Sequence, residues 1–386
     1  MPVNNSPSGP VPIIVVGAGL AGTTAAAVLG QQGWHVVLVD PRPSYPRVFK
    51  AEKIEPDQAE MLRKFGLLEC LLPHTGLIRE IKSYFNGHFF GLTPIEQYGI
   101  YYSDMVNPLR AHLPASVEFK LGRVVQISNS ADLQRVKLAG GEELTARLLV
   151  LACPLSPEIQ AGLRLKRVLI QKDQSLAIAF TIAPANGGPF PFDAVTYHAT
   201  SAASGVDYLS LFRIGESMRG NLFAFRAASE PWVSEFIREP IQGLERCMPK
   251  LRRAIGEYRV ISKVETGRVD LYRMEGDPQP GVVMIGDAAQ NSCPATGKGL
   301  TKIFTDVDVL SECVPVWFGS AGMGSERMMS FSQHPRKQAT DAKALHDAFY
   351  CRHACTGQSL RWRVHRLRLH LTMQFKRPTV RPAFSK

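Results

Sequence analysis

The sequence predicts an α/β protein in which a parallel sheet with flanking helices is interrupted by an inserted antiparallel sheet and followed by C-terminal helices. Two observations carry this prediction. The first 40 residues give an apolar run, a glycine turn, an Ala-rich segment and a second apolar run, which is typical of strand, helix and buried parallel strand. Residues 175–226 instead alternate apolar and aromatic side chains, as antiparallel strands do.

The elements follow from local patterns along the chain. We expect strands at 13–16, 36–39 and 281–285, strand-turn-strand patterns at 117–128, 133–138 and 144–152, and a small antiparallel excursion at 80–102. We expect helices at 23–32, 56–65, 106–113, 231–255, 299–314, 335–353 and 357–373, with a loop after the long helix that contains Pro315 and Trp317.

Composition narrows the class of protein. The 386 residues are 45% hydrophobic and 20% charged, as in globular proteins, and no apolar run is long enough to predict a membrane span. Residues 1–10 lack the pattern of a signal peptide, and seven scattered cysteines fit reduced thiols, so we expect a cytoplasmic protein without a metal site. The net charge of +11 favours acidic substrates, phosphate groups or anionic surfaces, but no nucleic-acid recognition module accompanies it.

The segment Gly17-Ala18-Gly19-Leu20-Ala21-Gly22 is a complete G-x-G-x-x-G motif between the first expected strand and helix. Gly17 permits the tight turn, Gly19 allows a pyrophosphate to approach, and Gly22 allows the helix to pack close to the strand. Free N–H groups and the helix dipole would favour the anion. Asp40 ends the second apolar run, near the spacing expected for a carboxylate that binds a ribose. The motif indicates a dinucleotide but does not distinguish NAD from FAD.

A second glycine segment distinguishes these two cofactors. The apolar run 282–285 ends in Gly286-Asp287, and glycines at 297 and 299 precede an apolar helical segment. A carboxylate at a strand end can accept a hydrogen bond from a ribityl chain, and glycines before a helix let the backbone approach a flat ring. The helix N-terminus would stabilise negative charge that develops on that ring. The two segments together indicate a flavin held between them.

On these two segments the chain resembles the FAD-dependent aromatic hydroxylases, the group A flavoprotein monooxygenases of the para-hydroxybenzoate hydroxylase type. The resemblance covers nearly the whole chain and is strongest at residues 11–70 and 280–312. It implies a Rossmann-type FAD-binding domain of the glutathione-reductase kind, with an inserted antiparallel-sheet substrate domain and C-terminal helices. It also implies an extended FAD, with its adenosine on the first motif and its flavin under the inserted sheet.

The resemblance assigns cofactor-binding roles by position. Residues 17–22 would hold the pyrophosphate, Asp40 the adenosine ribose, and Asp287 the ribityl and pyrophosphate region. An arginine that the family uses against the cofactor corresponds to Arg47 or Arg110. Further cofactor-binding candidates are Pro41, Arg42, Val125 and Gly286. The isoalloxazine would be lined by Pro294, Gly297, Gly299, Leu300 and Thr301.

The implied reaction is the hydroxylation or oxygenation of a small organic substrate, aromatic or acidic, with NADPH or NADH and O2. In that family reduced flavin and O2 form a C4a-hydroperoxide, while the protein excludes water and positions the substrate. No catalytic side chain is therefore assigned. The flavin-proximal candidates are Pro294, Gly297, Gly299 and Thr301.

Polar and aromatic residues of the two antiparallel segments are candidates to face the substrate. These are His88, Tyr98, Tyr101, Tyr102, Tyr197, His198, Tyr208 and Arg213. For each of them, an ordinary residue of a sheet or core is the favoured interpretation. Arg213 is the most informative, because a carboxylate substrate would need a bidentate partner.

One departure from the family pattern concerns the pyridine nucleotide. The family has a third motif, Asp-Gly, after the strand that precedes the inserted sheet, and Cys153-Pro154 stands in that place here. Thr301 also replaces the common Asn. We expect altered or weakened NAD(P)H use. A reductase or dehydrogenase on the same scaffold and a flavin-binding protein without NAD(P)H oxidation therefore remain alternatives, whereas the Trp-x-Trp-x-Ile-Pro segment of flavin-dependent halogenases is absent.

These patterns divide the chain into six segments. FAD-binding parts are expected at 11–80, 103–165 and 276–330, substrate-domain parts at 81–102 and 166–275, and a basic helical segment at 331–386. Within it, the amphipathic helix at 360–371 is expected to pack on the FAD-binding domain. Contact with a carrier protein or an anionic surface is the alternative for it.

Overall fold

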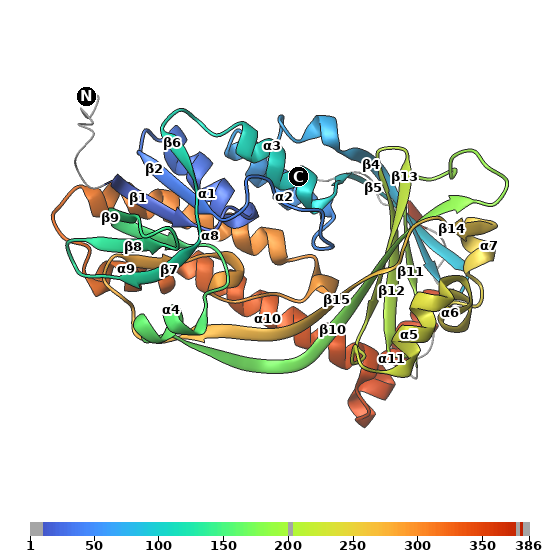
Figure 1. Ribbon diagram of the computed structural model, residues 1–386. Coiled ribbons are helices and arrows are strands. Elements are labelled where there is room, and N and C mark those ends of the chain that lie inside the picture. Colours follow the sequence, from blue (N-terminus) through green and yellow to red (C-terminus); the bar gives the residue numbers. More distant parts are fainter. Residues whose placement is uncertain (1–10, 200–203, 376–378, 381–386) are drawn as a thin grey trace.

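The computed structural model describes residues 11–199, 204–375 and 379–380, so that the lead-in expected at 1–10 lies outside the described residues. Two sheets form two halves of the molecule, and the long strands β10 (Lys166–Pro184) and β15 (Glu265–Glu275) run from one half to the other (Figure 1). The chain enters each half more than once, because β4 (Gly76–Phe85) and β5 (His88–Gly99) leave the first half to join the second sheet.

The first sheet contains the parallel strands that the apolar runs predict. Their spatial order is β6 (Val117–Leu121), β2 (Val36–Asp40), β1 (Val11–Val16), β9 (Glu143–Leu151) and β16 (Val282–Met284), with every neighbouring pair parallel. Ile13, Ile14 and Val15 are fully buried, as expected for a strand covered on both faces.

Helices cover one face of this sheet and an antiparallel meander covers the other. The helices are α1 (Leu20–Gln31), α2 (Pro56–Lys64), α3 (Tyr102–Ala111) and α8 (Gly299–Phe318). The meander consists of β7 (Val124–Ser128) and β8 (Gln134–Leu138), which pairs with β9, and α4 (Pro157–Gly162) packs beside it. The carboxyl ends of β1 and β16 therefore both open toward the α1 and α8 side of the molecule.

The second sheet has ten strands and contains the whole inserted segment. Its order is β14 (Tyr258–Val260), β10, β13 (Ser217–Ala224), β12 (Val206–Ile214), β11 (Ala194–His198), β4, β5 and β17 (Thr379–Val380). β15 pairs with β10, and β3 (Lys53–Ile54) pairs with β5. The expected excursion at 80–102 thus forms part of this sheet, because β4 pairs with β11.

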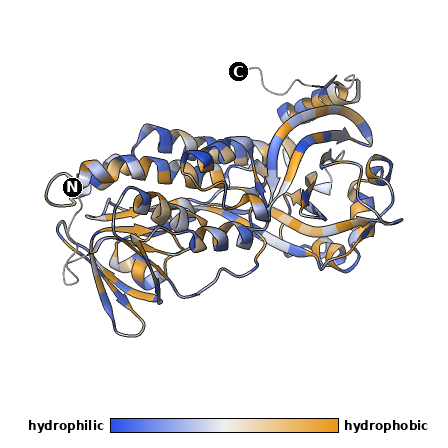
Figure 2. Ribbon diagram, turned by 90° about the horizontal axis from the view of Figure 1, so that it is seen from above, coloured by the Kyte–Doolittle hydropathy of each residue, from blue (hydrophilic) through white to orange (hydrophobic). Residues whose placement is uncertain are grey.

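Three short helices cover one face of the second sheet: α5 (Pro231–Arg238), α6 (Pro240–Cys247) and α7 (Leu251–Ile255). On this face Phe236 and Leu244 pack on Leu209 and Leu211. The opposite face looks toward the first half and α10 (Pro335–Thr356). Figure 2 shows apolar stretches along the strands of both sheets and mixed residues along the outer helices. The cores thus lie between each sheet and its covering layers.

Two helical predictions are wrong in extent, and one helix was not predicted. The single helix expected at 231–255 is broken into α5, α6 and α7, because prolines at 240 and 249 disfavour helical backbone in the residues before them. The loop expected around Pro315 is the end of α8, because Trp317 is buried against Phe331. α9 (Ser325–Ser332), which supplies Phe331, lies where no helix was expected.

The C-terminal helix does not pack on the FAD-binding half as expected. Trp362 of α11 (Leu360–Phe375) stacks on His353 of α10, with ring centroids 5.7 Å apart. His370 contacts Phe85 of β4, in the second sheet. Aromatic side chains of this basic helix contact rings of α10 and β4, and these contacts hold the helix beside α10 and the second sheet. Within residues 11–199, 204–375 and 379–380, the helices are too short or too polar to cross a membrane.

Candidate functional site

The first glycine motif forms a tight turn between β1 and α1, and its three glycines have different surroundings. Gly17 has a φ of +98°, and a Cβ on Gly22 would lie 1.8 Å from the Gly17 carbonyl oxygen. These two positions therefore require glycine for close packing. A Cβ on Gly19 would meet nothing closer than 3.8 Å, at the Tyr45 ring. The space above Gly19 is thus open at the N-terminus of α1.

Asp40 and Arg110 both contact this turn. The Asp40 carboxylate accepts hydrogen bonds from the Ala18 N–H (2.9 Å) and the Arg42 N–H (3.0 Å). The Arg110 guanidinium donates to the Ala18 carbonyl (2.9 Å) and lies 3.7 Å from Asp40. Burial lowers the pKa of Arg110 and the charge of Asp40 opposes this. Arg47 lies elsewhere, with its guanidinium 3.9 Å from the centre of the Tyr101 ring.

Two other cofactor candidates of this region lie in exposed chain. Pro41 is exposed directly after β2, next to Arg42. Val125, in β7, is 41% exposed and makes no part of the cavity described below. Their assignment stays a prediction.

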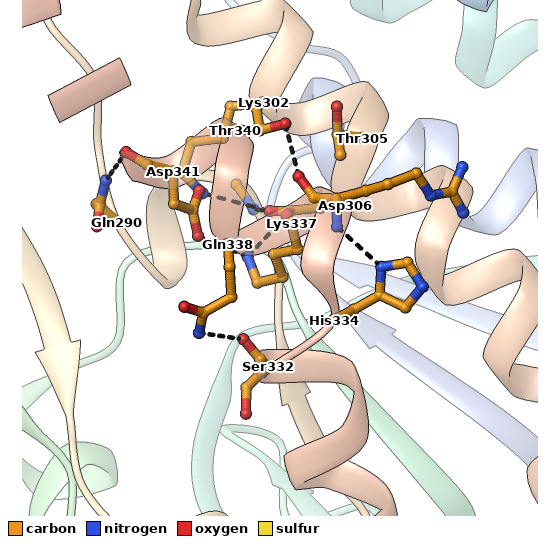
Figure 3. A network of polar contacts seen from close by, with 12 residues as sticks. Gln290, Lys302, Thr305, Asp306, Ser332, His334, Lys337, Gln338, Thr340 and Asp341 are labelled. Carbon is orange, nitrogen blue, oxygen red and sulfur yellow. Dashed lines mark hydrogen bonds and ion pairs between the residues drawn. The ribbon is translucent and has the colours of Figure 1, made fainter. Parts of the chain in front are cut away.

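The second glycine segment is anchored from beneath by a buried charge cluster, which we name the α8–α10 cluster: Lys302 and Asp306 of α8 with Lys337 and Asp341 of α10 (Figure 3). Asp306 accepts the Gly286 N–H at 2.7 Å and a hydrogen bond from the Lys337 ammonium at 2.7 Å. Burial acts to raise the pKa of Asp306, but Lys302 and Lys337 outweigh it and hold this pKa below its usual value. The cluster fixes the turn that presents Asp287.

The loop that follows Asp287 is tied to both halves of the molecule. Tyr208 of β12 donates to the Ala295 carbonyl at 2.9 Å. Gln58 of α2 donates to the Gly297 carbonyl at 2.8 Å and to the Thr301 hydroxyl at 3.1 Å. Gly297 has a φ of +66°. Gln58 was missed by sequence reasoning, because Glu55 and Gln58 indicate a capping box but not this long-range contact.

A cavity of about 350 Å³ lies between the two sheets at these segments. Its lining from the second glycine segment and α8 consists of Asp287, Asn291, Ser292, Pro294, Gly297, Gly299, Leu300 and Ile303. The inserted sheet contributes Ala177, Tyr208, Ser210, Phe212, Asn221, Phe223, Gly267, Arg268 and Val269. Residues 49–53, Glu55 and Tyr102 complete it. A larger hollow of about 440 Å³ lies on the other side of β16 and contains neither glycine motif.

Most flavin-side candidates line this cavity, and most substrate-side candidates do not. Asp287, Pro294 and Gly297 are exposed toward it, and the Asp287 carboxylate forms no ion pair with a described residue. Thr301 does not line it, because its hydroxyl donates to Asp57 at 3.0 Å. Among the eight substrate-side candidates, the cavity is lined only by Tyr102 and Tyr208.

Arg213 and Tyr197, two of the substrate-side candidates, lie away from this cavity. Side chains of β12 alternate, so that Tyr208, Ser210 and Phe212 face the cavity while Arg213 faces away from it. Arg213 donates to the Phe190 carbonyl at 2.9 Å and lies 3.5 Å from the Asp193 carboxylate. Tyr197 is buried on the face that α5–α7 cover.

Cys153 lies beside the first motif. A Cβ on Gly17 would lie 2.5 Å from the Cys153 Cβ, so that the residue in place of the family's Asp touches the turn itself. Burial, and then the charge of Asp40, raise the pKa of the Cys153 thiol to about 11. The thiol is therefore neutral at pH 7. A neutral thiol thus stands where the family motif would supply a carboxylate.

Lys50 is a cavity residue that sequence reasoning missed. Its ammonium lies 5.2 Å from the centre of the Tyr102 ring, and the Tyr102 hydroxyl accepts the Leu20 N–H at 3.4 Å, at the start of α1. Burial, followed by the interactions with the neighbouring Tyr45 side chain and with the Asp287 carboxylate, raises the pKa of Tyr102. Lys50 makes no ion pair among the described residues, so it is a cation close to the open N-terminus of α1. Nothing in the sequence distinguishes it from Arg47.

The comparisons with known proteins agree with this geometry. A family described as FAD binding domain matches residues 10–149. The chain is 28% identical to kynurenine 3-monooxygenase of Salinispora tropica, over 92% of this chain and 81% of that protein. It is 22% identical to squalene epoxidase erg1 of Aspergillus fumigatus, over 90% of this chain and 76% of that protein.

Among solved structures, p-nitrophenol 4-monooxygenase PnpA of Pseudomonas putida has a similar fold. The TM-score is 0.65 at 18% identity, and the match covers 94% of this chain and 98% of that one. At this identity the likeness concerns the fold alone. It covers both sheets, and not only the part that holds the first glycine motif.

Proposed function

Because this chain belongs to the group A flavin monooxygenases and is an FAD-dependent enzyme, we propose that it hydroxylates or oxygenates a small aromatic substrate with NADPH or NADH and O2. The observation that carries this proposal is the cavity between the sheets, which is lined both by the second glycine segment and by aromatic residues of the inserted sheet. A flavin and a flat substrate can thus share one enclosed space.

We place the FAD along the two glycine segments. The open space at Gly19 and the free N–H groups of α1 suit the pyrophosphate, with Lys50 as a cation beside it. Asp40 has acceptor capacity left for the adenosine ribose, and Asp287 for the ribityl chain. Arg110 would hold the turn instead of touching the phosphates, because its donors already bind backbone carbonyls.

The flavin ring would lie along Pro294, Gly297, Gly299 and Leu300. When bound, FAD supplies electron transfer from the nicotinamide and the activation of O2. The chain's own contribution is to position and to exclude water: Phe212 and Phe223 form apolar walls, and Tyr208 holds the Ala295 carbonyl. The N-terminus of α8 would stabilise negative charge on the ring.

The test is to mix FAD-loaded protein anaerobically with NADPH or NADH, then to add air and a panel of phenols and aromatic amines. We expect loss of the oxidised flavin absorbance with one nucleotide, followed by substrate-dependent O2 uptake and a product heavier by one oxygen atom. Reduction without any oxygenated product across the panel would contradict the proposal.

A second candidate function rests on Cys153-Pro154. The family's Asp-Gly is absent beside the first motif, so NAD(P)H binding is expected to be weak. A protein partner would then reduce the flavin in place of NAD(P)H. A flavin that stays oxidised with both nucleotides but is bleached by dithionite and restored by air would favour this candidate. Saturable nucleotide dependence would exclude it.

A further inference from the structure

A buried charge cluster, which we name the Glu52 triad, lies on the cavity wall. It consists of Glu52, which precedes β3, Arg219 of β13 and Glu265 of β15. Arg219 is 1% exposed and donates to both carboxylate oxygens of Glu52, at 2.8 and 2.9 Å. It also donates to Glu265. One guanidinium thus serves two carboxylates, and burial raises the pKa of Glu52 although Arg219 opposes this.

The Glu52 carboxylate has acceptor capacity that faces the cavity. Its Oε2 accepts from Arg219 and, at 3.1 Å, from the Asn221 amide in the orientation that also donates to the Gly220 carbonyl. Its Oε1 accepts only from Arg219 among the described residues. A carboxylate oxygen has room for about two hydrogen bonds. Glu52 and Asn221 both line the cavity, so we take the remaining acceptor position on Oε1 as the one that a ligand would use.

Aromatic side chains surround this acceptor. Phe49, Phe212 and Phe223 line the same cavity. Glu52 itself is only 4% exposed, so a hydrogen bond to it would form away from bulk water, where it is stronger. A flat ring with one donor group would satisfy both the apolar walls and the open oxygen.

Two of the three cations that line the cavity are already paired with carboxylates, and the third lies over Tyr102. Among the described residues, the lining cations are Lys50, Lys53 and Arg268. Lys53 lies 3.1 Å from Glu55, Arg268 lies 2.8 Å from Asp270, and Lys50 lies over Tyr102 near α1. A substrate carboxylate beside Glu52 would therefore meet a second carboxylate, while Arg219 is already bound to Glu52 and Glu265.

We propose that Glu52, oriented by Arg219, determines substrate specificity by accepting a hydrogen bond from a hydroxyl or amino group of an arene, and that it rejects aromatic acids. This inference rests on the proposed function, because it takes the cavity as the substrate site. It replaces the acidic substrate considered from the sequence. Glu52 is the specificity-determining residue and Arg219 a positioning residue.

The first experiment measures ligand binding to FAD-loaded protein through the change in flavin absorbance, with phenol, aniline and benzoate as probes. In the native protein we expect phenol and aniline to bind at least about tenfold more tightly than benzoate, as a hydrogen bond to a charged group predicts. Glu52→Gln should weaken phenol and aniline binding by about tenfold and reduce the discrimination against benzoate.

Glu265→Gln is the matched control. It also removes one carboxylate partner of Arg219, but Glu265 does not line the cavity, so the affinities for phenol and aniline should stay near those of the native protein, whatever happens to benzoate. Arg219→Lys tests the positioning role. Without the bidentate partner the pKa of Glu52 should rise, and the pH below which phenol binding weakens should move upward.

Two results would overturn the inference. One is tighter binding of benzoate than of phenol and aniline to the native protein, a result that does not depend on the folding of any variant. The other is an equal loss of phenol and aniline affinity in Glu265→Gln and Glu52→Gln. Binding is measured without turnover, so a protein that shows the expected order but consumes no O2 with any nucleotide would refute the proposed function and leave the Glu52 inference standing.

Discussion

At the scale of single residues, two glycines of the first motif serve different purposes: Gly22 is needed for packing in the folded protein, and Gly19 for the approach of a ligand. Gly22 has no room for a Cβ, since the Gly17 carbonyl oxygen would lie 1.8 Å away. Gly19 has room in the protein itself, where the Tyr45 ring lies 3.8 Å from a Cβ. A methyl group at Gly19 would instead occupy the space that we assign to the pyrophosphate.

We therefore predict different outcomes for two alanine variants. Gly19→Ala should fold with nearly native stability but bind FAD at least about tenfold more weakly, because a loss of about 1.4 kcal/mol of contact suffices for that. Gly22→Ala should lose more than about 2 kcal/mol of unfolding free energy. Flavin fluorescence titration and urea unfolding measure the two quantities. Native FAD affinity in Gly19→Ala would contradict the placement of the pyrophosphate.

Asp207 gives a prediction about pH. Burial raises the pKa of this carboxyl to about 7. Because the folded-state pKa lies above the ordinary value, the contribution of Asp207 to stability is complete below about pH 4 and is lost as the pH rises through about 7. Asp207→Asn should therefore gain unfolding free energy relative to the native protein between pH 5 and pH 8, by roughly 1–2 kcal/mol.

Urea unfolding at both pH values checks this expectation. Asp277→Asn, on an exposed loop, is the matched control and should show no such gain. A Asp207→Asn variant whose difference from the native protein is the same at pH 5 and pH 8 would show that the carboxyl ionises freely in the folded state.

At the scale of elements, the α8–α10 cluster joins the C-terminal region to the flavin-binding turn. Two lysines and two aspartates give it no net charge, and Asp306 and Lys302 are each 1% exposed. Their desolvation is tolerated because each charge has a partner. Sequence patterns do not reveal this cluster, since Lys337 and Asp341 are ordinary polar residues of a helix until α10 packs on α8.

Removal of one member should be costly. Lys337→Met leaves two aspartates with one lysine, so we expect a loss of about 3–5 kcal/mol of unfolding free energy and weaker FAD binding through the Gly286 turn. Lys343→Met, which removes an exposed partner of Asp347 on the same helix, should cost about 0.3–0.5 kcal/mol. Equal losses in the two variants, measured by urea unfolding, would mean that the cluster does not stabilise the turn.

At the scale of the whole molecule, the cavity depends on both sheets. If FAD binds as proposed, hydrogen exchange should slow at residues 17–22 and 286–301 and in the cavity strands β12 and β13. The helices α5–α7 lie on the far face of the second sheet and should exchange at the same rate with and without FAD. Mass spectrometry of the exchanged protein measures this pattern. Unchanged exchange at 286–301 would contradict the site.

The extent of sequence-based prediction differed between elements. The parallel strands and their glycine turns were predicted closely, because buried apolar runs and G-x-G-x-x-G depend on local residue order. The prediction of one helix at 231–255 was wrong, because two internal prolines divide this segment into α5, α6 and α7. α9 was missed because its burial depends on Trp317, a partner that the sequence alone does not bring near Phe331.

The sequence by itself determined the fold class, the two glycine segments and the identity of the cofactor, since each follows from residues that are neighbours in the chain. Only the tertiary structure decided which side chains meet in the cavity. Arg213 and Tyr208 lie on one strand and differ in face, and Glu52 meets Arg219 across 167 positions of sequence. Such contacts depend on how β12 and β13 pair and on how the second sheet closes over the first. Alternation along a strand sets the face of each side chain, but the residues that meet it on that face come from strands that are distant in the sequence.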